Sequence, residues 1–289
     1  MFANIAALPE SGHVFLATVL GLLVGSFLNV VIYRYPRLLK FQWTSQSHEW
    51  LNKEPYPETP PPGIVKPRSY CGHCKTPIKA WQNIPIISYL LLRGKCANCD
   101  ASISLRYPFV ELLTGVLSGF VVYQFGFTYQ ALFALILTWV LISLSFIDFD
   151  HKLLPDDIVL PTLWLGLGLS TLPLFVTSSE AIIGAVFGYL SFWCVFHLFK
   201  LATGKEGMGY GDFKLLSLLG AWFGWQVLPQ IILISTVLGA LIGIALIVLK
   251  KTGEDNTIPF GPYIAMAGWI AMIWGEKINQ IYLSSMGLG

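Results

Sequence analysis

Two short segments of this chain place aspartates at the ends of long apolar stretches. One is Ile147-Asp148-Phe149-Asp150-His151, and the other ends in Asp212 after the glycine-rich run that starts at Gly207. A charge at the centre of a membrane helix costs about 2.5–3.5 kcal/mol on insertion scales, so such residues usually have a function. Two carboxyl groups can together catalyse the hydrolysis of a peptide bond, because an ionised one activates water while a protonated one polarises the carbonyl. Asp148 and Asp212 are therefore a candidate aspartyl dyad.

The first member of this pair has rivals nearby. Asp150, Asp156 and Asp157 follow in the sequence, and periodicity alone does not choose among them, since Asp150 lies about 200° round a helix from Asp148. Close like charges push two pKa values apart, and the protons then belong to the pair rather than to one member. An acid at a helix N-terminus is also favoured by the helix dipole, which is the structural alternative for Asp212.

The glycine run before Asp212 predicts a turn that lets another chain approach closely. Gly209 and Gly211, with Lys214 two residues beyond the aspartate, are expected to form the turn or to bind an extended substrate. A phosphate loop is disfavoured, because the run lacks the Gly-Lys-Ser/Thr ending and no βαβ pattern surrounds it.

Four cysteines indicate a second kind of site. They form two C-x-x-C pairs separated by 21 residues, namely Cys71 with Cys74 and Cys96 with Cys99. Two such knuckles complete a tetrahedral, structural Zn2+ site with no open position for catalysis, and His73 is expected to shape a knuckle rather than to bind metal.

The elements that carry these residues are membrane helices. Of the 289 residues 55% are hydrophobic and 12% are charged, against about 25% charged in an average soluble domain. The apolar runs predict an all-α polytopic membrane protein with about eight transmembrane helices and a small zinc-binding cytoplasmic domain between helices 1 and 2. The expected spans are 13–33, 108–126, 129–147, 158–176, 181–200, 213–228, 230–249 and 262–282.

Basic residues predict the orientation. Eleven of the 18 Lys and Arg residues lie between Arg34 and Arg106, and with eight spans all others except Lys277 fall on the same side. By the positive-inside rule that side is cytoplasmic, and both termini are periplasmic. The expected domains are a first helix at 1–33, a zinc loop domain at 34–106 and a seven-helix membrane domain at 107–289. The basic loop carries no nucleic-acid motif, so lipid is the expected partner of its charge and nucleic acid is not.

The chain resembles the type IV prepilin peptidases over nearly its whole length. The four-Cys loop together with the glycine turn carries most of the specificity. The matching segments are Gly25–Arg34, Arg68–Cys74, Asn83–Ser88, Arg93–Cys99, Arg106–Glu111, the Asp148 segment with Leu154-Pro155-Asp156, and Glu206–Lys214. The chain departs from the family at Ser170, a position where asparagine is expected.

The resemblance implies a bifunctional enzyme of the bacterial inner membrane. It assigns the dyad to Asp148 and Asp212, with prepilins and pseudopilins as substrates, cut after a basic leader. It also implies methylation of the new N-terminus with S-adenosylmethionine, for which no nucleotide-binding strand-turn-helix is visible. Candidate residues for that donor lie near the membrane junctions of the loop, where anchoring at helix ends is an equal explanation. They are Asn29, Arg34, Arg106 and Glu111.

Two other functional classes compete with this interpretation. An ion-coupled transporter would also place acids in membrane helices, but more often near the midplane and within internally repeated broken helices. A zinc-knuckle membrane scaffold would explain the cysteines, but it leaves the glycine turn and Asp212 without a role.

Overall fold

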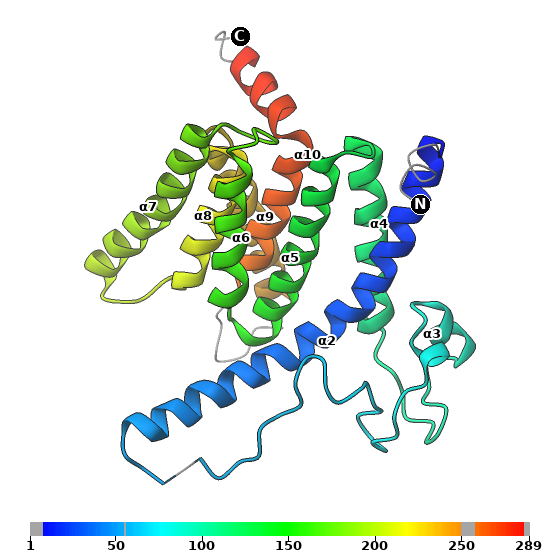
Figure 1. Ribbon diagram of the computed structural model, residues 1–289. Coiled ribbons are helices and arrows are strands. Elements are labelled where there is room, and N and C mark those ends of the chain that lie inside the picture. The colour runs from blue at the N-terminus through cyan, green and yellow to red at the C-terminus, as the bar shows by residue number, and fades with distance from the viewer. Residues whose placement is uncertain (1–7, 55, 250–257, 286–289) are drawn as a thin grey trace. The chain divides into compact units, whose positions relative to one another are not determined.

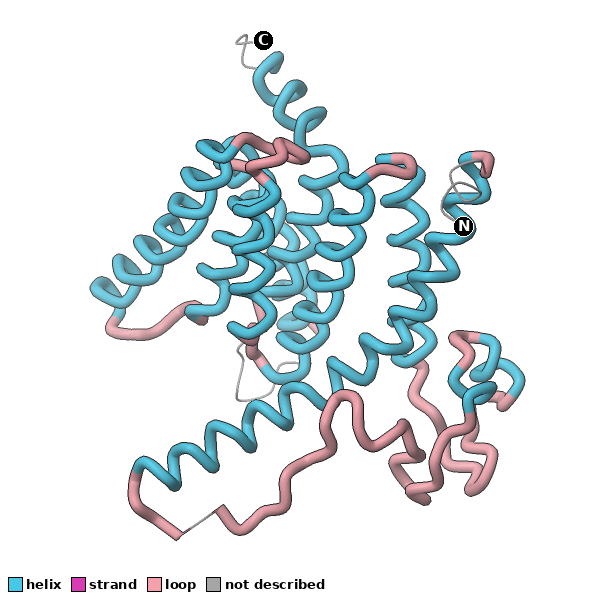
Figure 2. Tube along the Cα trace, viewed as in Figure 1, coloured by secondary structure: helices cyan, strands magenta, loops and turns pink. Residues whose placement is uncertain are grey.

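The computed structural model describes residues 8–54, 56–249 and 258–285, and the regular elements in these ranges are helices (Figure 1; Figure 2). They are α2 (Glu10–Trp50), η1 (Ala80–Asn83), α3 (Ile87–Leu91), α4 (Arg106–Phe125), α5 (Tyr129–His151), α6 (Asp156–Leu169), α7 (Ser178–Thr203), α8 (Tyr210–Phe223), η2 (Trp225–Val227), α9 (Leu228–Val248) and α10 (Gly261–Ser285). The predicted all-helical class is confirmed for the described part of the chain.

Each of the eight expected spans overlaps a different helix, but the helices differ in length, and the expected spans 158–176 and 213–228 run past the ends of α6 and α8. Five segments are long and apolar enough to cross a membrane within the residues described: α2, α4, α5, α7 and Trp225–Ala245. By contrast, α6 and α8 have 14 residues each. Each is about 21 Å long and so shorter than a hydrocarbon core of about 30 Å. The chain is thus a membrane protein, and eight complete crossings stay a prediction. Lys250 and Lys251, which the predicted orientation counted, lie outside the described residues, as do both chain ends.

Helix α2 continues well beyond the predicted end at residue 33. It has 41 residues, includes Pro36 and reaches Trp50, so its length of about 62 Å is twice the thickness of a bilayer core. The expected span followed the apolar run, which stops before Arg34. The end of an apolar run does not by itself end a helix, however. The expected boundary between residues 33 and 34 therefore falls inside one continuous helix.

The chain divides into two compact units, Met1–Ala131 and Leu132–Gly289. In the first unit α2 and α4 pack antiparallel through small residues. A side chain at Gly21 would collide with the Thr114 carbonyl, and one at Gly25 would lie 2.8 Å from Glu111 Cα. This close approach of two backbones is the packing that small-xxx-small patterns allow in membranes.

The second unit is built around α8. Asp212, Phe213 and every residue from Leu215 to Phe223 are buried, and α8 packs against α6, α7 and α10. Helix α7 approaches α8 through Gly184, at a position where a side chain would collide with the backbone of Gly220. A helix that is apolar on all sides belongs in the interior of a bundle, so α8 forms the centre of this unit.

Candidate active site and metal centre

The four cysteines predicted to bind metal converge in the first unit. One sulfur from each of Cys71, Cys74, Cys96 and Cys99 lies within 4.8 Å of the others. The Cys71 and Cys99 sulfurs are 3.8 Å apart, and those of Cys74 and Cys96 are 4.0 Å apart. Four thiolates around a tetrahedral ion with bonds of about 2.3 Å would have sulfurs separated by about 3.8 Å. This donor set therefore has the chemistry and the spacing of a metal site.

The two cysteine pairs adopt the same local conformation. The Lys75 amide donates to the Cys71 carbonyl at 3.0 Å, and the Asp100 amide donates to the Cys96 carbonyl at 3.1 Å. Lys75 and Asp100, each following the second cysteine of its pair, have φ values of 60° and 54°. One isolated β-bridge closes each turn, Tyr70 to Pro77 and Lys95 to Ser102. Each pair thus points two thiols in one direction.

The environment of Cys74 favours a thiolate. Hydrogen bonds with Thr76 and with the Asn98 side chain lower the pKa of the Cys74 thiol to about 5. A thiol must lose its proton to bind a metal, and Cys74 is the thiol most ready to do so, whereas desolvation and the neighbouring thiols raise the pKa of Cys99 to about 12.

Asp148 lies in the last turn of α5 and is buried, with 6% of its surface exposed. Its Oδ2 accepts a hydrogen bond of 2.9 Å from the backbone amide of Gly261, the first residue of α10. One oxygen of this carboxyl is therefore held in place, and a helix N-terminus points at it, an arrangement that favours negative charge.

Asp212 lies in the first turn of α8 and is 7% exposed. Its carboxyl is near enough to that of Asp148 for the two to interact electrostatically. Leu154 packs against Gly211, the neighbour of Asp212, and against Gly261, the amide partner of Asp148, since a side chain added at either glycine would lie 2.8 Å or 3.2 Å from it. The structure thus brings together the two aspartates that the sequence singled out.

The rival acids lie in a different environment. Asp150, Asp156 and Asp157 are exposed, whereas Asp148 is buried. Asp156 is moreover engaged by Lys214, whose Nζ lies 2.7 Å from both of its carboxylate oxygens. This ion pair joins the start of α6 to the second turn of α8. The sequence expected Lys214 to serve the turn or the substrate, and its observed partner favours a role in holding the turn.

The two predicted glycines face different surroundings. A side chain at Gly211 would lie 2.8 Å from Leu154 Cβ, so this position is needed for close packing. A side chain at Gly209 would meet only the Asp212 carboxyl, at 3.7 Å. The Asp212 carboxyl is therefore unobstructed on the side of Gly209.

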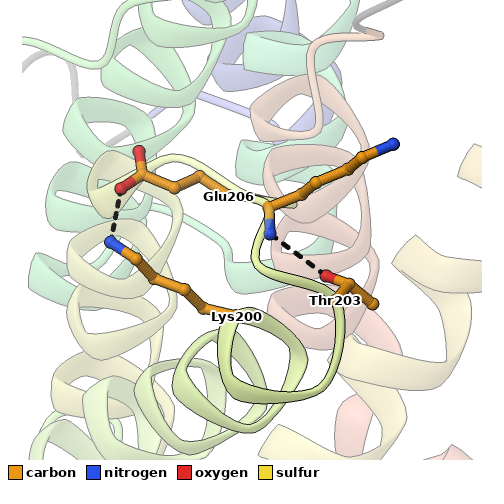
Figure 3. Close-up of polar contacts among 4 residues, drawn as sticks. Lys200, Thr203 and Glu206 are labelled. Carbon is orange, nitrogen blue, oxygen red and sulfur yellow. Dashed lines mark hydrogen bonds and ion pairs between the residues drawn. The ribbon is translucent and has the colours of Figure 1, made fainter.

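The loop that leads into the glycine run is shown in Figure 3. Helix α7 ends at Gly204, which has the left-handed φ of 70° that favours glycine. Lys200 forms an ion pair of 2.7 Å with Glu206, and the Lys205 amide donates to Thr203 Oγ1 at 3.3 Å. The two ionic side chains are 46% and 61% exposed, so this pair adds little stability.

Three of the four residues considered for the methyl donor bond backbone atoms of other segments: Arg34 and Glu111 bond the loop, and Asn29 bonds the first turn of α4. Arg34 donates to the carbonyls of Gly63 and Pro67 at 2.8 Å and 2.7 Å. Asn29 donates to the Tyr107 carbonyl at 3.1 Å, and Glu111 accepts from the Ile86 amide at 2.8 Å. Arg106, the fourth, is the first residue of α4. All four lie in the first unit.

Sequence reasoning missed Gly261, the amide partner of Asp148. The available signal was Pro259-Phe260-Gly261-Pro262 directly before an apolar span. Two prolines around a glycine predict a fixed turn at a helix start, but nothing in the residue types indicates which side chain that turn will meet.

Comparisons with known proteins agree with this geometry. Residues 19–125 match the family model of the bacterial peptidase A24 N-terminal domain, and residues 135–244 match that of the type IV leader peptidase family. A protein of Pseudomonas aeruginosa is 54% identical over 268 residues, which cover 93% of this chain and 92% of the relative. The chain belongs to the type IV leader peptidase family.

Further relatives carry the same name as the Pseudomonas aeruginosa protein, prepilin leader peptidase/N-methyltransferase. One from Aeromonas hydrophila is 51% identical over 91% of this chain and 91% of the relative. One from Neisseria gonorrhoeae is 50% identical, also over 91% of each chain. No solved structure matches the chain. The resemblance inferred from the cysteine loop and the glycine turn is thus confirmed at the level of the family.

Proposed function

We propose that this protein removes the leader peptide from prepilins and pseudopilins and then methylates the new N-terminus. Membership of a family whose relatives are named for both activities supports the pair of reactions. The observation that carries the peptidase half is the buried pair of interacting carboxyl groups, Asp148 and Asp212, at the ends of two helices.

In this proposal the dyad acts as a general acid and base. Like charges at short range resist ionising together, so one carboxyl is ionised and takes a proton from the attacking water. The protonated one polarises the scissile carbonyl and stabilises the charge that develops on its oxygen. The amide of Gly261 holds one oxygen of Asp148, which leaves the other oxygen for the reaction.

The substrate is proposed to approach over Gly209. This is the open side of the Asp212 carboxyl, whereas Gly211 is packed against Leu154. An extended peptide exposes a backbone that fits against a turn without side chains. A prepilin could therefore bring its scissile bond to the dyad while its apolar helix stays in the bilayer.

We propose Zn2+ as the metal of the four-Cys cluster. Four thiolates at tetrahedral spacing suit this ion and leave no position for water or substrate, so the ion would stabilise the loop rather than take part in the reaction. The loop has few helices of its own, and binding of the metal would add to its folding free energy.

S-adenosylmethionine is the proposed methyl donor. We place its site in the first unit, near Asn29, Arg34, Arg106 and Glu111. Arg34 and Glu111 already bond loop backbone, and Asn29 bonds the Tyr107 carbonyl in α4, so their proposed role is to shape the site rather than to contact the donor.

The proposed location is the bacterial inner membrane, with the cysteine loop in the cytoplasm and both termini in the periplasm. The clustering of basic residues from Arg34 to Arg106 supports this orientation. A functional division into a first helix (1–33), a loop domain (34–106) and a membrane peptidase domain (107–289) remains part of the proposal, with the continuous helix α2 joining its first two parts.

The test compares wild type with Asp148→Asn, Asp212→Asn and Asp150→Asn in membranes. Each receives a prepilin and S-adenosylmethionine, and mass spectrometry reads the N-terminus of the product. Wild type and the exposed control Asp150→Asn are expected to yield a trimmed, methylated product, and the other two variants none. Cleavage by all four proteins would refute the dyad. Cleavage by none, despite normal insertion, would favour a carrier or a scaffold.

A further inference from the structure

The segment between the two cysteine pairs exposes apolar side chains. It contains η1 and the short helix α3, and the exposed fractions are 43% for Ile84, 55% for Ile87, 68% for Leu90 and 69% for Leu91. So many exposed large aliphatic side chains in so short a segment are unusual, and in a soluble domain they would indicate a binding surface; they are called the apolar patch below.

The position of α3 relative to α4 gives the depth of this patch. The Ile86 amide, directly before α3, donates to Glu111 Oε2 at 2.8 Å. Glu111 is five residues into α4, which starts at Arg106 and is long and apolar enough to span a membrane. At 1.5 Å per residue Glu111 lies about 7.5 Å along the helix from the first residue of α4, and the start of α3 lies beside that level. Figure 1 shows α3 beside this end of α4.

The loop segment that contains Gly63 and Pro67 lies farther from the bilayer than α3 does. Arg34 binds the carbonyls of Gly63 and Pro67, and it is nine residues beyond Gly25, whose Cβ position meets Glu111. Because α2 and α4 run antiparallel, the Arg34 level is about 13 Å beyond Glu111 along the axis. It therefore lies outside the start of α4.

Charged and aromatic residues flank the apolar patch. Lys79, Arg93 and Lys95 are exposed on either side of it, and Trp81 is 48% exposed. Interfacial segments bury their apolar face about 5–10 Å into the boundary between headgroups and acyl chains. Their cations contact lipid phosphates, and tryptophan is enriched at the same level.

We propose that residues 80–91 form an interfacial membrane anchor. Ile84, Ile87, Leu90 and Leu91 enter the bilayer surface beside α4, and the flanking cations bind anionic phospholipid headgroups. This anchor lies beside α4 and holds the four-Cys cluster next to the membrane. The inference does not depend on the proposed enzymatic function.

The test uses the full-length protein in vesicles of phosphatidylethanolamine and phosphatidylglycerol. The photoreactive amino acid p-benzoylphenylalanine is placed at position 87 or 91, where the native side chains are 55% and 69% exposed. The matched control has it at position 65, where Val65 is 80% exposed in the segment held by Arg34. After irradiation, mass spectrometry identifies lipid adducts and protein crosslinks.

The expected result is lipid adducts at positions 87 and 91 that exceed those at position 65 several-fold. Two results would overturn the anchor. One is lipid labelling at 87 and 91 no greater than at 65. The other is crosslinking at these positions to a second copy of the chain or to another protein in place of lipid.

Discussion

Replacing Gly261 by alanine would place a methyl group against the Asp148 carboxyl. The new Cβ would lie 2.7 Å from Asp148 Oδ2 and 3.1 Å from Cγ. Non-bonded heavy atoms settle at about 3.5 Å, so the carboxyl would have to retreat by about 0.8 Å. A displacement of about 1 Å of a reacting group can cost about 10²-fold in rate. We expect kcat for leader cleavage to fall by about tenfold to hundredfold.

The assay measures two activities of Gly261→Ala separately. Initial rates of prepilin cleavage report the dyad, and methylation of an already trimmed pilin reports the other half of the enzyme, which should be unchanged. Gly168→Ala in α6 is the matched control, because its new side chain would meet nothing within 4 Å. Alanine suits the first turn of a helix, so thermal unfolding of both variants should resemble wild type.

Wild-type kcat in Gly261→Ala, at an unchanged unfolding temperature, would refute the reasoning. It would mean that the position of Asp148 is not set by the start of α10, or that Asp148 is not in the dyad. A loss of methylation equal to the loss of cleavage would instead indicate general misfolding.

Three other changes have defined outcomes. Gly209→Ala should keep the unfolding temperature and lower kcat/KM for prepilin cleavage, since its side chain would enter the open space above Asp212; an unchanged kcat/KM would exclude substrate approach on that side. Lys214→Met removes the ion pair with the half-exposed Asp156 and should lower the free energy of unfolding, measured by chemical denaturation, by about 1 kcal/mol or less. A loss above about 3 kcal/mol would contradict so weak a contribution. Cys74→Ser should lose the bound metal by elemental analysis and make the loop sensitive to protease, and full metal retention would disprove the four-thiolate site.

The metal site was predictable because spacing along the chain determines it. Two cysteines three positions apart can share one tight turn, and two such turns can meet at one ion. The structure adds what spacing does not contain, such as the left-handed conformations of Lys75 and Asp100 that close the two turns.

The dyad was predictable only in part. The cost of charge in apolar segments pointed to Asp148 and Asp212 as the proposed dyad. Residue types and periodicity could not separate Asp148 from Asp150, because burial depends on packing against distant segments, and only the family resemblance favoured Asp148. Gly261 is 113 residues from Asp148, and no periodicity connects them. The close packing of α2 with α4 did have a local signal, since Gly21 with Gly25 and Gly115 with Gly119 both have small-xxx-small spacing.

That distance of 113 residues also has a consequence for biosynthesis. Asp148 leaves the ribosome long before Gly261, by about 6–20 s at a synthesis rate of about 5–20 residues per second. Asp212 lies on a helix that is buried only when α6, α7 and α10 surround it. A nascent or truncated chain therefore carries both aspartates without the packing that buries them. If they form the proposed dyad, peptidase activity begins only once α10 is in place.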